Sequence, residues 1–366
     1  MRSTITVKGS RTSKVCIASG ILQEDPKSWM RFAQRRLAII SDSNVAPLYA
    51  KDLITKLHSK GCEAKLFLFP SGERHKTRNT LCLLQDLILD WGIDRSSAII
   101  GLGGGVVTDI AGYVAASLMR GIDFISIPTS LLAMVDASVG GKTGVNTRHG
   151  KNLIGAFYPA TSVLIDPQVL QTLPSNRFLE GVVEMIKHGA IADATYFQDL
   201  LHNAKEILQL DNEMLENSIT KSIKIKASVV TEDEQEKTGK RFILNFGHTI
   251  GHSLELASQY KISHGNAVAI GMVAEAELAV KMKILPPDAK EMLVDALEKY
   301  GIETTIPKDL SQKTLLKAMT YDKKNRTQQP RFVMINAIGS CAPFKGAYCS
   351  EVKMEMIDAL FINKTE

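Results

Sequence analysis

The chain has 366 residues, of which 45% are hydrophobic and 23% charged, a balance that is typical of a globular protein with about two domains. The formal net charge of +5 comes without a basic tract or an aromatic-interleaved patch, which argues against nucleic acid as a partner. Five scattered cysteines without a CxxC pair favour reduced thiols and a cytoplasmic location, and we expect no signal peptide because the N-terminus lacks an apolar segment.

Short apolar runs alternate with helical patterns along the first half of the chain. One of the helical patterns covers residues 80–91 and is closed by Gly92. This alternation predicts a mostly parallel, doubly wound sheet, which is a Rossmann-like α/β domain over residues 1–174. The runs that we expect to form strands are residues 37–40, 65–69, 98–100, 124–127 and 163–165.

Residues 98–119 form an apolar segment long enough to suggest a membrane span. Asp109 is its one charged residue, and several glycines interrupt it. A buried strand, a turn over residues 101–105 and a helix that covers a sheet explain this pattern better. We therefore expect no membrane partner.

The sequence changes in character near residues 172–178. From there to Tyr300 it is helical in period, for example over residues 197–208, 215–230 and 266–282. Residues 331–335 could form a late strand or a hairpin arm. We expect residues 175–366 to form a mainly α-helical domain that binds metal and substrate.

A glycine-rich turn at residues 101–105 follows a predicted strand and opens a predicted helix. Such a turn lets the backbone approach a pyrophosphate at a helix N-terminus. Val106 stands where the full dinucleotide fingerprint has glycine, so a tight connection without a ligand is an alternative. Asp42, at the end of an earlier strand, could bind a ribose or cap a helix. Residues 71–76 add polar groups after the next strand.

The polar cluster at residues 136–146 has the composition of a phosphate loop. It does not match the Walker A spacing, because Asp136 stands where that motif requires glycine. With Lys151 and Asn152 nearby, the segment offers two lysines and two amides to an anion. A polar turn between a helix and a strand is the alternative.

Three histidines lie close together in the second half of the chain. His248 and His252 are four residues apart and share one face of a predicted helix, and His264 follows in the next segment. Two histidines alone are more often a polar helix face, but a third histidine with Glu184 makes a set that suits a catalytic divalent metal. Thr249 stands at the position of a metalloprotease base, which argues against a protease.

These separated motifs together resemble those of the 3-dehydroquinate synthase family of sugar phosphate cyclases. The resemblance runs from about residue 41 to residue 339, and it implies a dehydroquinate synthase-like fold. It rests on ordered matches at residues 103–109, 119–121, 136–145, 151–155, 184–187, 226, 241, 245–252, 264–265 and 322–324.

The resemblance implies a phosphorus–oxygen lyase of aromatic amino acid biosynthesis in the shikimate pathway. Its sugar phosphate substrate, 3-deoxy-D-arabino-heptulosonate 7-phosphate, would become 3-dehydroquinate and phosphate. The implied cofactors are NAD and a divalent metal, zinc or cobalt. The implied steps are transient oxidation, phosphate elimination, reduction, ring opening and an intramolecular aldol reaction. A homodimer is also implied, in which Arg120 reaches the substrate phosphate of the neighbouring subunit.

The resemblance also assigns individual residues. The metal is assigned to Glu184, His248 and His264. NAD is assigned to Asp42, Asn44, Ser71, Gly72, Glu73, Lys76, Gly103, Gly104, Gly105, Val106, Val107, Asp109, Thr129, Ser130, Lys142, Lys151 and Thr172. The substrate is assigned to Arg120, Asp136, Lys142, Asn152, Lys187, Lys226, Arg241, Asn245, His252 and one of Lys323 or Lys324.

Two positions depart from the family pattern, Asn266 after His264–Gly265 and Ser130 after Pro128, and we interpret both as tuning. One alternative is a cyclase for a sugar phosphate that lacks the carboxylate. The joint presence of Lys226, Arg241, Asn245 and His252 argues against it. The others are a polyol or alcohol dehydrogenase and a non-catalytic relative.

Overall fold

A computed structural model describes residues 3–23, 34–307, 310, 312–320, 330–344, 346–358 and 360 of the chain. Its contacts divide the chain into two compact units. The first unit is Met1–Phe178 with Leu215–Thr231, and the second is Leu179–Met214 with Glu232–Glu366. Among the described residues, no helix combines the length and the apolar character that a membrane crossing requires.

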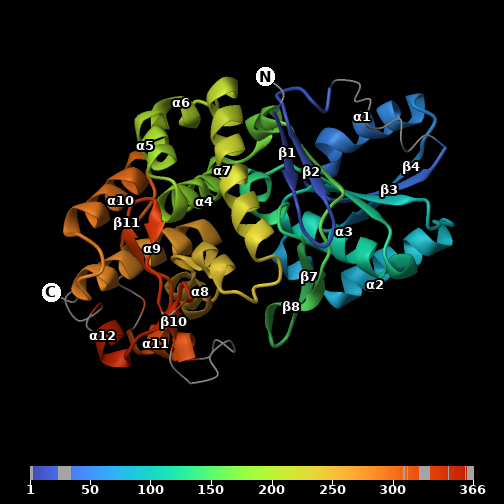
Figure 1. Cartoon of the computed structure of the whole chain (residues 1–366). Coiled ribbons are helices and arrows are strands. Elements are labelled where there is room, and N and C mark those ends of the chain that lie inside the picture. The colour runs from blue at the N-terminus through green and yellow to red at the C-terminus, as the bar shows by residue number, and fades with distance from the viewer. Residues whose placement is uncertain are drawn as a thin grey trace. The chain divides into compact units, whose positions relative to one another are not determined.

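A seven-stranded sheet forms the centre of the first unit (Figure 1). Its strand order is β1-β2-β9-β6-β5-β3-β4, and every neighbouring pair is parallel except β1 with β2. The five strands expected from apolar runs are all present, as β3, β4, β5, β6 and β9. The strand bounds are Ser3–Val7 (β1), Ser13–Ile17 (β2), Arg36–Asp42 (β3), Glu63–Phe69 (β4), Ala98–Gly103 (β5), Asp123–Pro128 (β6) and Ser162–Ile165 (β9).

Helices cover both faces of this sheet, as the alternating pattern predicts. In Figure 1, α1 (Ala46–Ser59) lies on one side of the sheet, and α2 (Arg78–Asp90) and α3 (Gly105–Ser117) lie on the other. All residues of β5 and β9 are buried, which is expected of strands covered on both faces. The doubly wound α/β fold is therefore confirmed, and the expected helix over residues 80–91 is α2.

Two antiparallel hairpins of the first unit were not expected from the sequence. One is β1 with β2, and the other is β7 (Lys142–Thr147) with β8 (Gly150–Phe157). Within the segment 136–146, residues 138–141 form the turn between a helix and a strand that was the alternative, and the segment continues from Lys142 as strand β7. The phosphate-loop interpretation stays a prediction. A Cβ at Gly155 would lie 1.9 Å from the Thr143 carbonyl oxygen, so the pairing of β7 with β8 requires a glycine there.

Helices make up most of the second unit, as expected. The prediction of one helix over residues 197–208 is wrong, because α5 ends at His202 and α6 begins at Ala204. The late strand expected at residues 331–335 is divided between β10 (Arg331–Phe332) and β11 (Ile335–Ala337). The helices from α4 onward are Ser175–Ala192 (α4), Ala194–His202 (α5), Ala204–Leu208 (α6), Asn212–Glu232 (α7), His248–Ala257 (α8), His264–Lys281 (α9), Pro287–Lys299 (α10), Gln312–Thr320 (α11) and Met354–Asp358 (α12).

Most of α7 groups with the first unit, although it follows α4 to α6 in the sequence. The short strands β12 (Ser340–Cys341) and β13 (Ser350–Glu351) pair with β11 and β10. The division into domains at residues 174 and 175 stays a prediction.

Candidate active site

The sheet has a topological switch point between β3 and β5. Strand β3 pairs with β4 on one side and with β5 on the other, so the chain runs from β3 to β4 in one direction and then crosses back to β5 on the opposite side of β3. Ligands of open α/β sheets bind at the carboxyl ends of strands at such a point. These ends are Asp42 and Gly103, and helix α3 begins directly afterwards at Gly105. An anion here would meet the N-terminus of α3.

Asp42 shapes the loop that follows β3. Its Oδ1 accepts hydrogen bonds from the backbone N–H groups of Asn44, at 2.8 Å, and Val45, at 3.0 Å. The next loop is joined to it, since the backbone N–H of Ser71 donates to the Ser43 hydroxyl at 3.1 Å. The polar residues predicted after β3 and β4 therefore lie side by side. Helix α1 begins at Ala46 and has no side-chain cap, so the Oδ1 contacts of Asp42 order the loop before the helix and do not bear out the capping role considered for this residue.

The glycine turn packs tightly against the segment after β6. A Cβ at Gly103 would lie 2.5 Å from the Val107 side chain, so this glycine permits close packing of strand and helix. A Cβ at Gly104 would lie 3.3 Å from the Ser130 hydroxyl, and the Thr129 N–H donates to the Gly103 carbonyl at 3.0 Å. The structure thus brings together five residues assigned to NAD, namely Gly103, Gly104, Val107, Thr129 and Ser130. Strand β5 continues to Gly103, so the turn is shorter than the one expected over residues 101–105.

A buried lysine connects three segments near this turn. Lys76 is 4% exposed, and its Nζ donates to Asp109 at 2.5 Å and to the Asn152 side chain at 2.6 Å. Asn146 donates to Glu73 at 2.7 Å, and its own Oδ1 accepts from the Asn152 N–H at 2.9 Å. Burial raises the pKa of Asp109, and the charge of Lys76 opposes that rise. Predicted NAD and substrate residues therefore share one hydrogen-bond network.

A second buried lysine of the first unit contacts a π-helical turn. Lys226, on α7, is 5% exposed and donates to both the side chain and the carbonyl oxygen of Asp136. Asp136 belongs to the π-helix Ala133–Ala137, a geometry that is frequent at functional sites. This pair joins two of the residues assigned to the substrate.

Other predicted residues of the first unit are placed more simply. Lys142 is exposed at the start of β7, and Lys151 is half-buried on β8. The Thr172 hydroxyl donates to the Val169 carbonyl at 3.0 Å and contacts the Tyr49 hydroxyl. These observations describe the surroundings of the three residues but do not show which ligand they bind.

Arg120 is exposed on a turn with an unusual backbone. Met119 has φ 51°, Arg120 has φ 68° and Gly121 has φ 118°, so three consecutive residues lie in the left-handed region. Non-glycine residues in that region are uncommon and cost about 1 kcal/mol or more each. Backbone strain of this kind is most often found at functional positions.

Four ionisable side chains converge in the second unit. Glu184 and Lys187 on α4 form a buried ion pair, in which Lys187 is 1% exposed. Glu184 Oε1 lies 3.8 Å from Nε2 of His248 and 4.0 Å from Nε2 of His264. One ligand atom from each of Glu184, His248 and His264 lies within 4.8 Å of the others. These three residues could hold a metal ion.

The outer nitrogen of each of these two histidines has a hydrogen-bond acceptor. Nδ1 of His248 lies 3.2 Å from the Phe246 carbonyl oxygen, and Nδ1 of His264 lies 3.4 Å from Oε2 of Glu255. If each Nδ1–H donates to its acceptor, both Nε2 atoms keep a free lone pair toward Glu184. Sequence reasoning missed Glu255, whose only signal is an acid in an apolar helical stretch.

The pKa values of the two histidines shift in opposite directions. Burial, followed by the positive charge of Lys187, holds the pKa of His248 well below its usual range. For His264 burial also acts to lower the pKa, but the hydrogen bond and charge of Glu255 raise it overall. A neutral His248 is the form that can bind a metal.

His252 is exposed on the same face of α8 as His248. Its ring centroid lies 5.3 Å from that of His248 and 6.1 Å from that of His264. With Glu255 and His264 it forms a second group able to hold a metal. In that group Glu255 would be a ligand itself, and not only an acceptor that orients His264.

Arg241 is held in the loop before α8. It is buried, its guanidinium donates to the Glu234 carbonyl oxygen, and its backbone N–H donates to Asp233 at 3.1 Å. Although burial opposes the shift, hydrogen bonds from backbone N–H groups lower the pKa of Asp233. Asn245 is half-buried at the end of this 3-10 segment. Sequence reasoning missed Asp233, and Lys323 and Lys324 lie outside the described residues.

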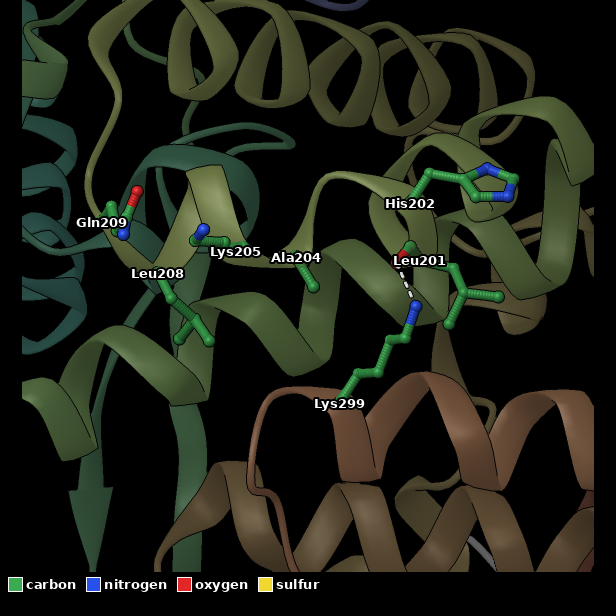
Figure 2. A pocket seen from close by; sticks show the side chains of 7 residues that line it. All are labelled: Leu201, His202, Ala204, Lys205, Leu208, Gln209 and Lys299. Atoms are coloured by element: carbon green, nitrogen blue, oxygen red, sulfur yellow. Dashed lines mark hydrogen bonds between the residues drawn. The ribbon is translucent and has the colours of Figure 1, made fainter.

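A separate pocket of the second unit contains none of the predicted site residues (Figure 2). Its lining comes from α5, α6 and α10 and from the residues directly after α6. Lys299 there donates to the Leu201 carbonyl oxygen at 3.3 Å. The lining residues are Leu201, His202, Ala204, Lys205, Leu208, Gln209 and Lys299.

Two family models cover most of the chain. Residues 66–180 match the model described as 3-dehydroquinate synthase N-terminal, and residues 181–325 match the one described as 3-dehydroquinate synthase C-terminal. The chain belongs to the 3-dehydroquinate synthase family. It is 43% identical over 308 residues to a 3-dehydroquinate synthase of Microcystis aeruginosa, which covers 83% of this chain and 84% of the relative. A Rippkaea orientalis 3-dehydroquinate synthase is 40% identical over 374 residues, covering 100% and 99% of the two chains.

Solved structures agree with this family membership. A 2-deoxy-scyllo-inosose synthase complexed with carbaglucose-6-phosphate, NAD+ and Co2+ has a TM-score of 0.86 at 27% identity, covering 98% of this chain and 99% of its own. A 2-epi-5-epi-valiolone synthase from Streptomyces hygroscopicus with NAD+ and Zn2+ bound has a TM-score of 0.85 at 25% identity, covering 98% of both chains. An iron containing alcohol dehydrogenase shares the fold alone, with a TM-score of 0.64 at 14% identity over 99% and 98% of the two chains.

Proposed function

We propose that this chain is a 3-dehydroquinate synthase that converts 3-deoxy-D-arabino-heptulosonate 7-phosphate into 3-dehydroquinate and phosphate. The observation that carries the proposal is the convergence of Glu184, His248 and His264 beside Lys187 in a member of this family. In the shikimate pathway such an enzyme acts as a phosphorus–oxygen lyase. A cytoplasmic location stays a prediction.

The donor set of Glu184, His248 and His264 fits a divalent metal such as zinc or cobalt. Two imidazoles and one carboxylate leave coordination positions for substrate oxygens. We prefer this set to His252–Glu255–His264, because it keeps the hydrogen bond that orients His264. When bound, the metal supplies a Lewis acid for substrate hydroxyl oxygens.

The switch point of the sheet fits NAD. Gly104 leaves room beside Ser130 that a side chain would restrict, and the N-terminus of α3 favours a pyrophosphate. Asp42 ends β3 and Lys76 lies in the loop after the neighbouring strand β4, where the ribose and nicotinamide groups would bind. When bound, NAD supplies reversible oxidation of one substrate alcohol.

The remaining residues would bind and orient the substrate. We assign the phosphate group to Asn152 and Lys187, with His252 balancing its charge. Arg241 suits the substrate carboxylate, because a guanidinium binds a carboxylate through two parallel hydrogen bonds. Lys226 would hold nearby hydroxyls while Asp136 keeps its ammonium in place.

A homodimer would complete the site through Arg120. Arg120 is exposed on a turn with positive φ from Met119 to Gly121, and this exposure supports a role outside its own subunit. In the proposed arrangement, Arg120 contacts the substrate phosphate of the neighbouring subunit.

A cyclase for a sugar phosphate without the carboxylate is the second candidate, and the likeness to the two solved cyclases favours it. Burial of Arg241, which gives a carboxylate a strong partner, argues for the first candidate. A dehydrogenase shares the fold but has no use for the phosphate-binding lysines.

The deciding experiment measures phosphate release from 3-deoxy-D-arabino-heptulosonate 7-phosphate with zinc or cobalt and substoichiometric NAD. We expect many turnovers per NAD, abolished by Glu184→Ala or His264→Ala. Release from a seven-carbon sugar phosphate without the carboxylate, but not from this substrate, would select the second candidate. NADH accumulation with a simple polyol would indicate a dehydrogenase.

A further inference from the structure

Glu275 is a fully buried acid that none of the proposed steps uses. It lies on α9, among apolar residues, with 0% of its surface exposed. A buried carboxyl group is costly unless hydrogen bonds satisfy it. Its partners therefore show why an acid stands there.

The partners of Glu275 are backbone groups at the start of α8. Its Oε2 accepts from the Gly247 N–H at 2.7 Å, and its Oε1 accepts from the Ile250 N–H at 3.3 Å. Helix α8 has no cap of its own, because the N-cap residue is Gly247, which has no side chain and a φ of 80°. The first N–H groups of a helix need such acceptors. Glu275 thus caps α8 from a neighbouring helix.

This cap lies next to a proposed metal ligand. His248 is the first residue of α8, between the two residues that Glu275 holds. His264 is likewise the first residue of α9, the helix that carries Glu275. The distance between the two histidines therefore depends on how α8 is fixed against α9.

Close packing of α8 against α9 leaves little room for one helix to shift along the other. A Cβ at Gly271 would lie 2.0 Å from the Gly247 carbonyl oxygen, and a Cβ at Gly251 would lie 3.0 Å from the Ala267 carbonyl oxygen. The backbones are in contact at this crossing, with Glu275 one turn beyond Gly271. A shift of α8 would move His248 directly.

We propose that Glu275 is a positioning residue for the metal centre, which fixes the first turn of α8 and thereby the Nε2 atom of His248. This inference rests on the proposed metal site. Glu275 touches neither the metal nor the substrate in this arrangement, and it acts through the backbone on both sides of His248.

The test compares Glu275→Gln with Glu216→Gln in the full-length protein. Glu216 is a buried acid of the first unit that also accepts a backbone hydrogen bond, from Ser19 at 3.2 Å, so it is a matched control. Zinc affinity is measured by competition with a chromophoric chelator. The geometry of the site is measured by the visible absorption of the cobalt-loaded protein, and folding by circular dichroism.

We expect Glu275→Gln to weaken zinc binding by roughly 10–100-fold, the range typical of groups that orient metal ligands, and to change the cobalt spectrum. Glu216→Gln should bind zinc as the unchanged protein does. Should Glu275→Gln be unfolded, Glu275→Asp, which keeps a shorter carboxyl group, serves in its place with the same expectation.

Wild-type affinity and an unaltered cobalt spectrum in the folded Glu275 variant would overturn the inference. An equal loss of zinc affinity in both variants would also overturn it, because the effect would then be general destabilisation. Absence of zinc binding by the unchanged protein would instead refute the metal site of the proposed function. The two failures are therefore distinguishable.

Discussion

The Glu184 carboxylate pairs with Lys187 through one oxygen and faces His248 with the other, whose distance to the His248 Nε2 is 3.8 Å. A single acid thus connects the group proposed to bind phosphate with the group proposed to bind metal. Because the pair is buried, each partner is stabilised by the other and is costly to remove alone.

Replacing Glu184 by glutamine should abolish tight metal binding. The substitution keeps the shape of the side chain but removes the negative charge that a divalent cation needs. We therefore expect zinc affinity to fall by more than about 100-fold, which is more than the loss typical of groups that only orient metal ligands. Chelator competition measures it, with Glu277→Gln as a half-exposed control on α9. Wild-type zinc affinity in Glu184→Gln would contradict the assignment.

Replacing Lys187 by methionine should separate metal binding from turnover. The variant loses the proposed phosphate contact, and we expect kcat to fall by roughly 100–1,000-fold, as when a preorganised charge-stabilising group is removed. Zinc affinity should be kept or raised, because Glu184 no longer pairs with an ammonium group. Phosphate release and zinc titration are measured on the same samples. Loss of zinc binding together with activity would argue against these separate roles.

Mixing two inactive variants should restore activity if Arg120 serves the neighbouring subunit. In a dimer of one Arg120→Ala and one Lys187→Met chain, one site keeps both residues. Random pairing after subunit exchange predicts about a quarter of the wild-type rate, since half of the dimers are mixed and half of their sites are intact. Phosphate release by the mixture is compared with that of each variant alone. No gain on mixing would place Arg120 in its own subunit's site.

The metal-free protein should lose stability as pH rises toward 8. Burial raises the pKa of Glu275 to about 8, and hydrogen bonds from the Gly247 and Ile250 N–H groups oppose that rise. The folded state therefore holds a proton that the unfolded state releases near pH 4.5, the ordinary value for this group. The stabilisation is complete below that pH and is lost progressively up to about pH 8.

The slope of this loss is at most about 1.4 kcal/mol per pH unit in the free energy of unfolding. Urea unfolding at several pH values, with a chelator present, measures it. Glu275→Gln has no such proton and should give a flatter dependence. An identical slope in the two proteins would show that other groups are responsible.

Replacing Asp233 by asparagine should weaken substrate binding through Arg241. Asp233 accepts hydrogen bonds from the backbone N–H groups of Lys237, Thr238 and Arg241, so its loss loosens the loop that carries the guanidinium. We expect KM to rise about tenfold, equivalent to about 1.4 kcal/mol, with kcat nearly kept.

Asp193→Asn is the matched control, because Asp193 caps α5 by accepting from the Tyr196 N–H at 2.9 Å. It should lower stability without changing KM. An equal rise of KM in both variants would assign the effect of Asp233 to stability alone.

The sequence by itself determined the features that depend on local periodicity. Apolar runs located β3, β5, β6 and β9, because strands covered on both faces are largely apolar. The run at residues 65–69 located β4, an edge strand in which buried and exposed residues alternate. Helical spacing brought Glu184 to Lys187 on α4 and His248 to His252 on α8. Resemblance then selected Glu184, His248 and His264 as the metal set and assigned His252 to the substrate.

Only the tertiary structure decided the contacts made by residues distant in the chain. Glu255 and Glu275 are ordinary acids of helical stretches in the sequence, and their roles depend on which backbone or imidazole group lies opposite. The hairpin of β7 and β8 depends on a backbone contact at Gly155, and the grouping of α7 with the first unit depends on packing. Periodicity specifies which face of a helix or strand is buried, whereas these contacts depend on which distant segment of the chain packs against that face.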